Sequence, residues 1–164
     1  MIGNARFFLS FNLKACYLAF MQVKVLTLDD KDSILNLERA QVSEEDFMFE
    51  WTASWREEFL DFYLEKGWSY AVYTGGKISS YFLAQPILFL RAHMQSLWLE
   101  HMYISNEEEK NYLLEVAYRT AKDKHLQKLM FNEDLVTNLS LQDHAYVGTK
   151  ESFYAKSTTK MKET

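Results

Sequence analysis

The sequence is poor in the residues that shape loops and cross-links. Of its 164 residues, 5 are glycine, 1 is proline and 1 is cysteine. Average usage would give roughly 11 glycines and 8 prolines in a chain of this length. Few positions therefore allow the backbone to approach a ligand without intervening side chains. A single cysteine excludes a disulfide framework and a thiolate metal cluster.

The chain also lacks long apolar runs and an excess of positive charge. It contains no apolar run of roughly 18 residues, so no transmembrane helix is expected. The formal net charge of -5 argues against a general nucleic-acid-binding protein, which needs a basic face. The 4 histidines show no paired metal-ligand spacing, so no metal site is predicted. A hydrophobic content of 48% excludes disorder for most of the chain.

Residues 1–20 differ from the rest, because they are apolar and aromatic and contain no acidic residue. Three interpretations stay open: an extension or loosely packed arm before a start at Met21, a targeting segment, or an added strand or helix. Asn12 and Lys14 interrupt the apolar stretch that a signal peptide needs. We expect one domain over residues 21–157 and a polar tail over 158–164, in a cytoplasmic protein unless the first segment is a targeting signal.

Residue patterns after Met21 predict alternating strands and helices. Strands are expected at 22–28, in the two runs that flank Gly75-Gly76 within 67–90, and at 96–105, 128–134 and 150–157. Helices are expected at 31–43, from Ser54 to Gly67, at 106–125 and at 135–146, with capping boxes from Ser54 to Glu57 and from Ser105 to Glu108. This order predicts a single α/β or α+β domain with a mixed sheet of about six strands and about four helices.

Three segments together resemble the GNAT acetyltransferase superfamily over about residues 21–157. VKVLTLDDKDSILNLERA resembles the family's first strand and helix, and WSYAVYTGGKISSYFLAQPIL its second and third strands. LWLEHMYIS and the long helix after it resemble the fourth strand and the cofactor-binding helix. The LAQP and DKHLQK segments are similar to uncharacterised bacterial GNAT-like proteins. The resemblance implies a GNAT-like N-acetyltransferase that uses acetyl-CoA and acts on a small-molecule or peptide amine.

The resemblance also implies where the cofactor and the amine bind. The sheet of such proteins splays between the fourth and fifth strands, and acetyl-CoA enters that split. The expected cofactor-binding residues are Met102, Tyr103 and Ile104 in the strand, and Lys110, Asn111 and Tyr112 in the helix. The residues expected to line the acceptor pocket are Trp51, Trp55 and Trp68.

Acetyl transfer to an amine needs a base and an acid. The resemblance makes Glu100 the expected base, beside a dry cleft, and Tyr146 or His144 the expected acid. Neighbouring residues of a strand point to opposite faces, so only one of Glu100 and His101 is expected to face the cleft. We expect His101 to be a core or surface histidine.

One segment departs from the family pattern. The family places Arg or Gln followed by Gly-x-Gly or Gly-x-Ala at the start of the long helix, where backbone N–H groups reach the pyrophosphate. Residues 105–115, SNEEEKNYLLE, contain no glycine, and Glu107, Glu108 and Glu109 occupy the positive end of the helix dipole as a solvated helix start. Two hypotheses follow: an acetyltransferase with an altered cofactor loop, or a GNAT-fold binding module that has lost catalysis. A homodimer formed through residues 1–20 or a sheet edge is a third hypothesis.

Overall fold

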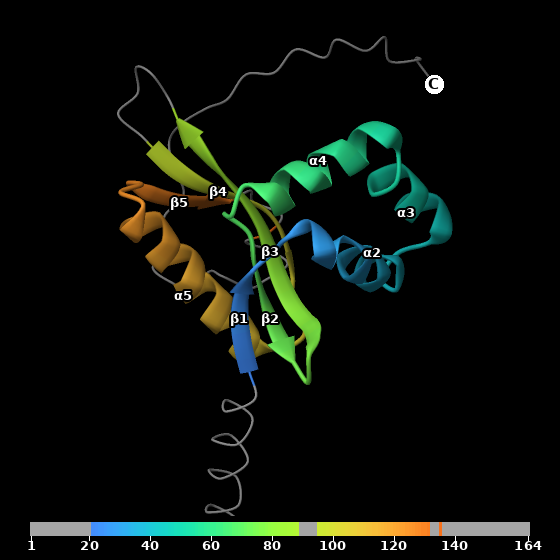
Figure 1. The fold of residues 1–164 in the computed structure, drawn as a ribbon, viewed down its shortest axis with the longest axis horizontal. Helices are drawn as coiled ribbons and strands as arrows, with labels where there is room; N and C mark the ends of the chain where they lie inside the picture. The colour runs from blue at the N-terminus through green and yellow to red at the C-terminus, as the bar shows by residue number, and fades with distance from the viewer. Residues whose placement is uncertain (1–20, 89–94, 132–134, 136–164) are drawn as a thin grey trace, which may run out of the picture.

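The computed structural model describes residues 21–88, 95–131 and 135, which form three layers. A sheet lies in the middle, with the C-terminal described helix on one face and the earlier helices on the other (Figure 1). The strands are β1 (Met21–Val25), β2 (Tyr70–Thr74), β3 (Lys77–Leu88), β4 (Gln95–Tyr103) and β5 (Lys128–Phe131). The helices are η1 (Leu28–Asp30), α2 (Lys31–Arg39), α3 (Glu44–Glu50), α4 (Ser54–Glu65) and α5 (Glu107–Asp123).

The sheet has the order β1-β2-β3-β4-β5. Strands β1 to β4 are antiparallel neighbours, and β5 is parallel to β4. The predicted mixed α+β architecture is thus confirmed. The helix expected at 135–146 and the strand expected at 150–157 lie outside the described residues.

Glycines with positive φ lie at two changes of chain direction. Gly75 and Gly76 have φ values of 61° and 79°, which residues with a Cβ atom rarely adopt, and they join β2 to β3 as the predicted hairpin. Gly67, with φ 72°, follows the end of α4 as the predicted helix stop.

The boundaries of the helices in this layer differ from the predicted ones. The helix expected at 31–43 ends at Arg39, and a separate helix, α3, begins after Ser43. The Ser43 hydroxyl accepts a hydrogen bond from the backbone N–H of Asp46 at 3.2 Å, which caps α3. The residue that caps α4 is Ala53, so the predicted capping box from Ser54 to Glu57 is wrong.

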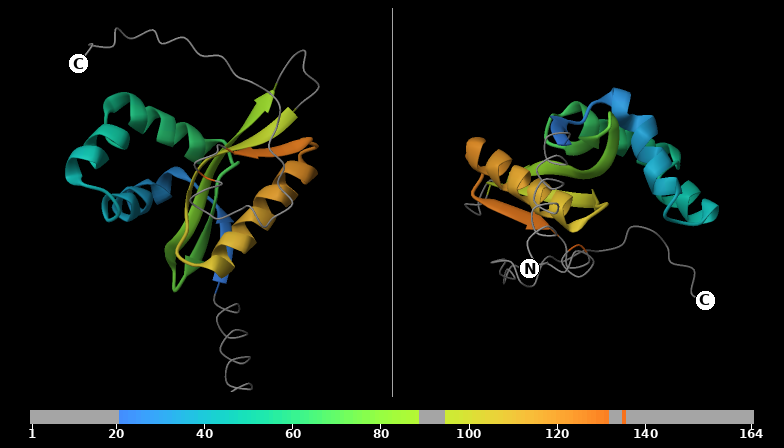
Figure 2. Two further views of the ribbon diagram at one scale, coloured as in Figure 1. Left: turned by 180° about the vertical axis from the view of Figure 1, so that it is seen from behind. Right: turned by 90° about the horizontal axis from the view of Figure 1, so that it is seen from below.

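Two apolar cores hold the layers together, one on each face of the sheet. Figure 2 shows α5 on one face of the sheet and the other helices on the opposite face. The core under α5 contains Val72, Phe82, Ala84, Leu97, Leu99, Leu113 and Ala117. The core under α2 and α4 contains Leu26, Ile34, Leu60, Leu64, Ala71, Tyr81 and Leu83. Successive residues of β3 alternate between these cores, which fixes the face that each side chain of the strand occupies.

Two kinds of site were sought among the described residues. No helix in this part of the chain has the length and apolar character that a membrane crossing requires. Within the described ranges, no three His, Cys, Asp or Glu side chains come together in a way that could hold a metal ion.

Candidate active site

A β-bulge interrupts the pairing of β3 with β4. Leu83 pairs with His101, whereas its neighbour Ala84 pairs with Leu99, so Glu100 is an extra residue in β4. A bulge breaks the alternation of side chains at the point where it occurs. Glu100 and His101 consequently both lie on the face that α2 and α4 cover. The expectation that only one of them could face a common site is wrong, because it assumed a regular strand.

His101 is held by a buried carboxylate from another element. Glu38, in α2, is only 5% exposed, and its Oε1 accepts hydrogen bonds from the Tyr81 hydroxyl at 2.5 Å and from His101 Nε2 at 3.0 Å. The residues come from α2, β3 and β4, which pack together through the core under α2 and α4. A buried carboxylate with two donors is much less costly than an unpaired one.

These contacts distinguish the two ring nitrogens of His101. A carboxylate oxygen accepts, so Nε2 is the nitrogen that donates to Glu38, and Nδ1 is the nitrogen that this contact does not use. Tyr81 is fully buried; burial first, and then the charge of Glu38, raise the pKa of its hydroxyl well above the usual value. Tyr81 therefore stays a hydrogen-bond donor, while the side chain of His101 is 35% exposed and can meet solvent or a ligand.

Aromatic rings fix the orientation of the histidine. Trp51 meets the His101 ring edge to face, with centroids 5.2 Å apart. Tyr103 stacks on Tyr81 at a centroid distance of 6.0 Å and an interplanar angle of 11°. Edge-to-face and offset rings stabilise such contacts beyond their buried area. His101 is thus bordered by Trp51, one of the three tryptophans expected at the acceptor pocket.

Glu100 lies in a more open environment than expected. Its side chain is exposed, and its Oε2 accepts a hydrogen bond from Trp98 Nε1 at 2.6 Å. Burial first, and second the charge of Glu100, raise the pKa of Tyr63 to about 12. Glu100 therefore lies toward α4, in solvent rather than in the dry cleft that was expected for it.

The outer edge of β4 is only partly covered. Its pairing with β5 ends at Leu99 and Phe131, and within the described ranges no strand pairs with β4 beyond that point. Among the described strands, the segment from His101 to Tyr103 pairs with β3 alone. Of the residues expected to bind the cofactor here, Met102 is buried in the core under α5, and Tyr103 and Ile104 are half-buried. The unpaired edge lies where the resemblance predicts a split in the sheet.

The first turn of α5 is partly buried and forms hydrogen bonds with the rest of the protein, whereas a fully solvated helix start was expected. Asn106 is the cap, and its Oδ1 accepts from the backbone N–H of Glu109 at 3.0 Å, so the predicted capping box from Ser105 to Glu108 is wrong. The carboxylate of Glu109 is buried and accepts from the Ser80 hydroxyl. Lys110 is also buried and forms an ion pair with the exposed Glu107. Of the other expected cofactor-binding residues, Asn111 and Tyr112 are exposed.

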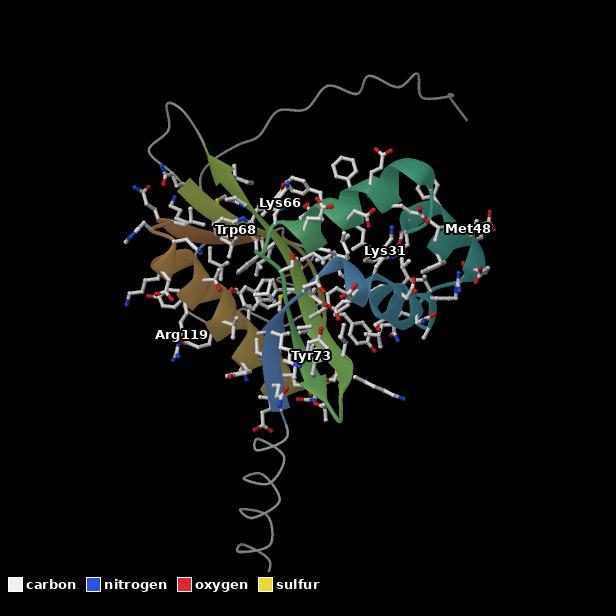
Figure 3. The ribbon with its side chains drawn as sticks, in the orientation of Figure 1. Lys31, Met48, Lys66, Trp68, Tyr73 and Arg119 are labelled. Atoms are coloured by element: carbon white, nitrogen blue, oxygen red, sulfur yellow. The ribbon has the colours of Figure 1, made fainter. Side chains whose placement is uncertain are left out.

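Of the remaining expected site residues, only Trp68 has a described side chain, and it lies away from His101. Trp68, labelled in Figure 3, packs against the core under α5, on the face of the sheet opposite Trp51. The structure describes no side chain for Trp55. Tyr146 and His144 lie outside the described residues.

The helices on the His101 side of the sheet carry the negative charge of the chain. Residues 31–66 contain ten acidic and four basic residues and so a net charge of -6, compared with -5 for the whole chain. A surface of one sign raises the local concentration of oppositely charged ligands. This layer therefore favours a cationic ligand.

Comparison with solved structures identifies the fold. The structure is similar to ribosomal-protein-alanine N-acetyltransferase from Brucella melitensis biovar Abortus 2308, with a TM-score of 0.60 and 12% identity over 84% of this chain and 98% of that one. It is similar to an aminoglycoside N-acetyltransferase in complex with CoA, with a TM-score of 0.60 and 11% identity over 85% of this chain and 95% of that one.

A third similar structure is an aminoglycoside acetyltransferase from an uncultured soil metagenomic sample, in complex with sisomicin. Its TM-score is 0.58 and its identity 12%, over 85% of this chain and 98% of that one. No protein-family model and no curated protein matches the sequence. At these identities the likeness establishes a GNAT-like fold, as the sequence predicted, and leaves the activity to be argued from the site.

Proposed function

We propose that this protein is an N-acetyltransferase that transfers an acetyl group from a thioester, acetyl-CoA, to an amine. The observation that carries the proposal is the pair of Glu38 and His101, which lies at the β-bulge, beside the part of β4 whose outer edge pairs with no described strand. The GNAT-like fold supports the same class of reaction. The amine-binding side is the acidic layer over residues 31–66, which attracts an ammonium ion.

His101 is the proposed base, in place of Glu100. An amine reaches neutral solution as an ammonium ion, so a proton must leave before nitrogen can attack a carbonyl carbon. Nδ1 of His101 accepts that proton, directly or through a water molecule, and the carboxylate of Glu38 stabilises the resulting imidazolium. Glu100, on the same face, orients the ammonium ion or the water.

The end of β4 and the residue that follows it fit the arm of the proposed cofactor. Backbone N–H and C=O groups of Met102, Tyr103 and Ile104 can pair with the amide groups of a pantetheine chain as a further strand would. When bound, acetyl-CoA supplies the thioester carbonyl and a thiolate leaving group. A proton must reach that thiolate, and Tyr146 or His144 stays the proposed acid.

The experiment is a transfer assay with acetyl-CoA and a panel of amines, read as release of free thiol and as mass of the product. His101→Gln should lower kcat/KM by about 10²–10⁴, the usual contribution of general base catalysis. His125→Gln is the matched control, because His125 is exposed and lies after α5. No transfer to any amine would refute the proposed function, and equal activity of the two variants would refute His101 as the base.

A further inference from the structure

The junction between β4 and α5 already uses two of its backbone N–H donors within the protein. The Ser105 N–H donates to the Ser80 hydroxyl at 2.8 Å, and the Glu109 N–H donates to Asn106 Oδ1 at 3.0 Å. In the fold that this chain shares, a diphosphate would need N–H groups of this junction. Two such groups already have partners, and the first partner, Ser80, also donates to Glu109.

The charges at the same place oppose an anion. Glu107, Glu108 and Glu109 fill the first turn of α5, where the helix dipole would otherwise favour a phosphate. Lys110 is the only basic residue in 105–115. Its side chain is 4% exposed and is paired with Glu107, so its charge is already opposed by a carboxylate. The residues at the start of α5 therefore do not fit a diphosphate.

Binding along the edge of β4 does not depend on the charge of nearby side chains. A pantetheine arm is uncharged and pairs with backbone groups, which Met102 to Ile104 supply whatever their side chains are. The two halves of a CoA thioester thus meet different surfaces in this protein. The pantetheine arm would lie along backbone groups of residues 102–104, whereas the nucleotide diphosphate would lie beside the carboxylates at the start of α5.

We infer that this protein recognises its donor as a pantetheine thioester and gains little from the nucleotide half of CoA. The inference rests on the proposed function. Its consequence is a wider donor class than acetyl-CoA, including acetyl thioesters of pantetheine that lack the nucleotide. Binding energy from parts of a substrate far from the reacting atoms normally raises kcat/KM. If the nucleotide half of CoA contributes little, the ratio of kcat/KM for donors with and without the nucleotide should be small.

The experiment compares kcat/KM for acetyl-CoA and S-acetyl-pantetheine with one amine, and the affinities of CoA and pantetheine by calorimetry. We expect each ratio to be below about tenfold. A preference for the CoA compound of tenfold or more in either measurement would overturn the inference. Absence of transfer from both donors, with equal binding of CoA and pantetheine, would refute the proposed function and leave the inference supported. Absence of binding by both would overturn the two together.

A charge-reversal pair tests the physical cause. Glu108→Lys changes the charge of the first turn without touching the pair of Lys110 and Glu107, and it should raise the preference for acetyl-CoA severalfold. Glu115→Lys makes the same reversal at an exposed position two turns along α5 and should leave the ratio unchanged. An unchanged ratio in both variants would show that these carboxylates do not limit donor recognition.

Discussion

Replacing Glu38 with alanine tests the cluster that positions His101. The substitution removes the acceptor of two hydrogen bonds at once, one from Tyr81 and one from His101. His101 is partly exposed and can turn to water, but the Tyr81 hydroxyl is fully buried and would lose its partner. The main loss of stability therefore comes from the buried Tyr81 hydroxyl, which is left without a hydrogen-bond partner.

The magnitude follows from burial. An unsatisfied buried polar group costs about 1–3 kcal/mol. Loss of the buried methylene of Glu38 adds about 0.8 kcal/mol, so that the total is roughly 2–4 kcal/mol. For a chain of this size that total lowers the melting temperature by roughly 5–15 °C.

The assay is reversible thermal or urea unfolding, with a double-mutant cycle between Glu38→Ala and Tyr81→Phe. The two changes remove the same hydrogen bond, so their effects should fall short of additivity by about 0.5–3 kcal/mol. Glu50→Ala, at an exposed position in α3, should change stability by no more than about 0.5 kcal/mol. A Glu38→Ala protein as stable as the Glu50→Ala protein would refute the reasoning.

Further predictions concern pH, capping, backbone and association. The pKa of Tyr63 is raised to about 12 by burial and a nearby carboxylate, so its contribution to stability should be full below pH 10 and fall as pH rises toward 12; Tyr63→Phe should make that loss in urea unfolding smaller. Asn106→Ala should destabilise the fold by about 0.5–2 kcal/mol, and Ser105→Ala by much less, since only the first removes the cap of α5. Gly76→Ala should cost about 1 kcal/mol through its φ of 79° alone, because a Cβ atom there meets nothing within 4 Å; a larger loss in urea unfolding would point to an unseen contact. Sedimentation of the full chain should show a dimer that a chain beginning at Met21 does not form, if residues 1–20 mediate association, and identical monomers would contradict this.

Local signals in the sequence account for much of the fold. The Gly75-Gly76 hairpin, the stop at Gly67 and the amphipathic α5 each depend on neighbouring residues, so a pattern along the chain could find them. Helix α3 was missed although Ser43 and three acidic residues mark its start. The pattern that predicted one helix over 31–43 had simply continued past Arg39.

The candidate site depends on pairing between distant segments, which no local pattern contains. Glu38 lies four residues after Ile34, on the buried stripe of α2, and a charged residue there is a signal that a partner must exist. The sequence could not say that the partners are Tyr81 and His101. Nor could it reveal the bulge, because the alternation of β4 looks regular until its register with β3 is known.

The bulge makes Glu100 superfluous to the architecture of the sheet. Leu99 belongs to the core under α5, and His101 lies on the opposite face. If Glu100 were deleted, these two residues would become neighbours with alternating faces, and the ladder with β3 would be regular on both sides. A chain without Glu100 should therefore fold with both cores intact.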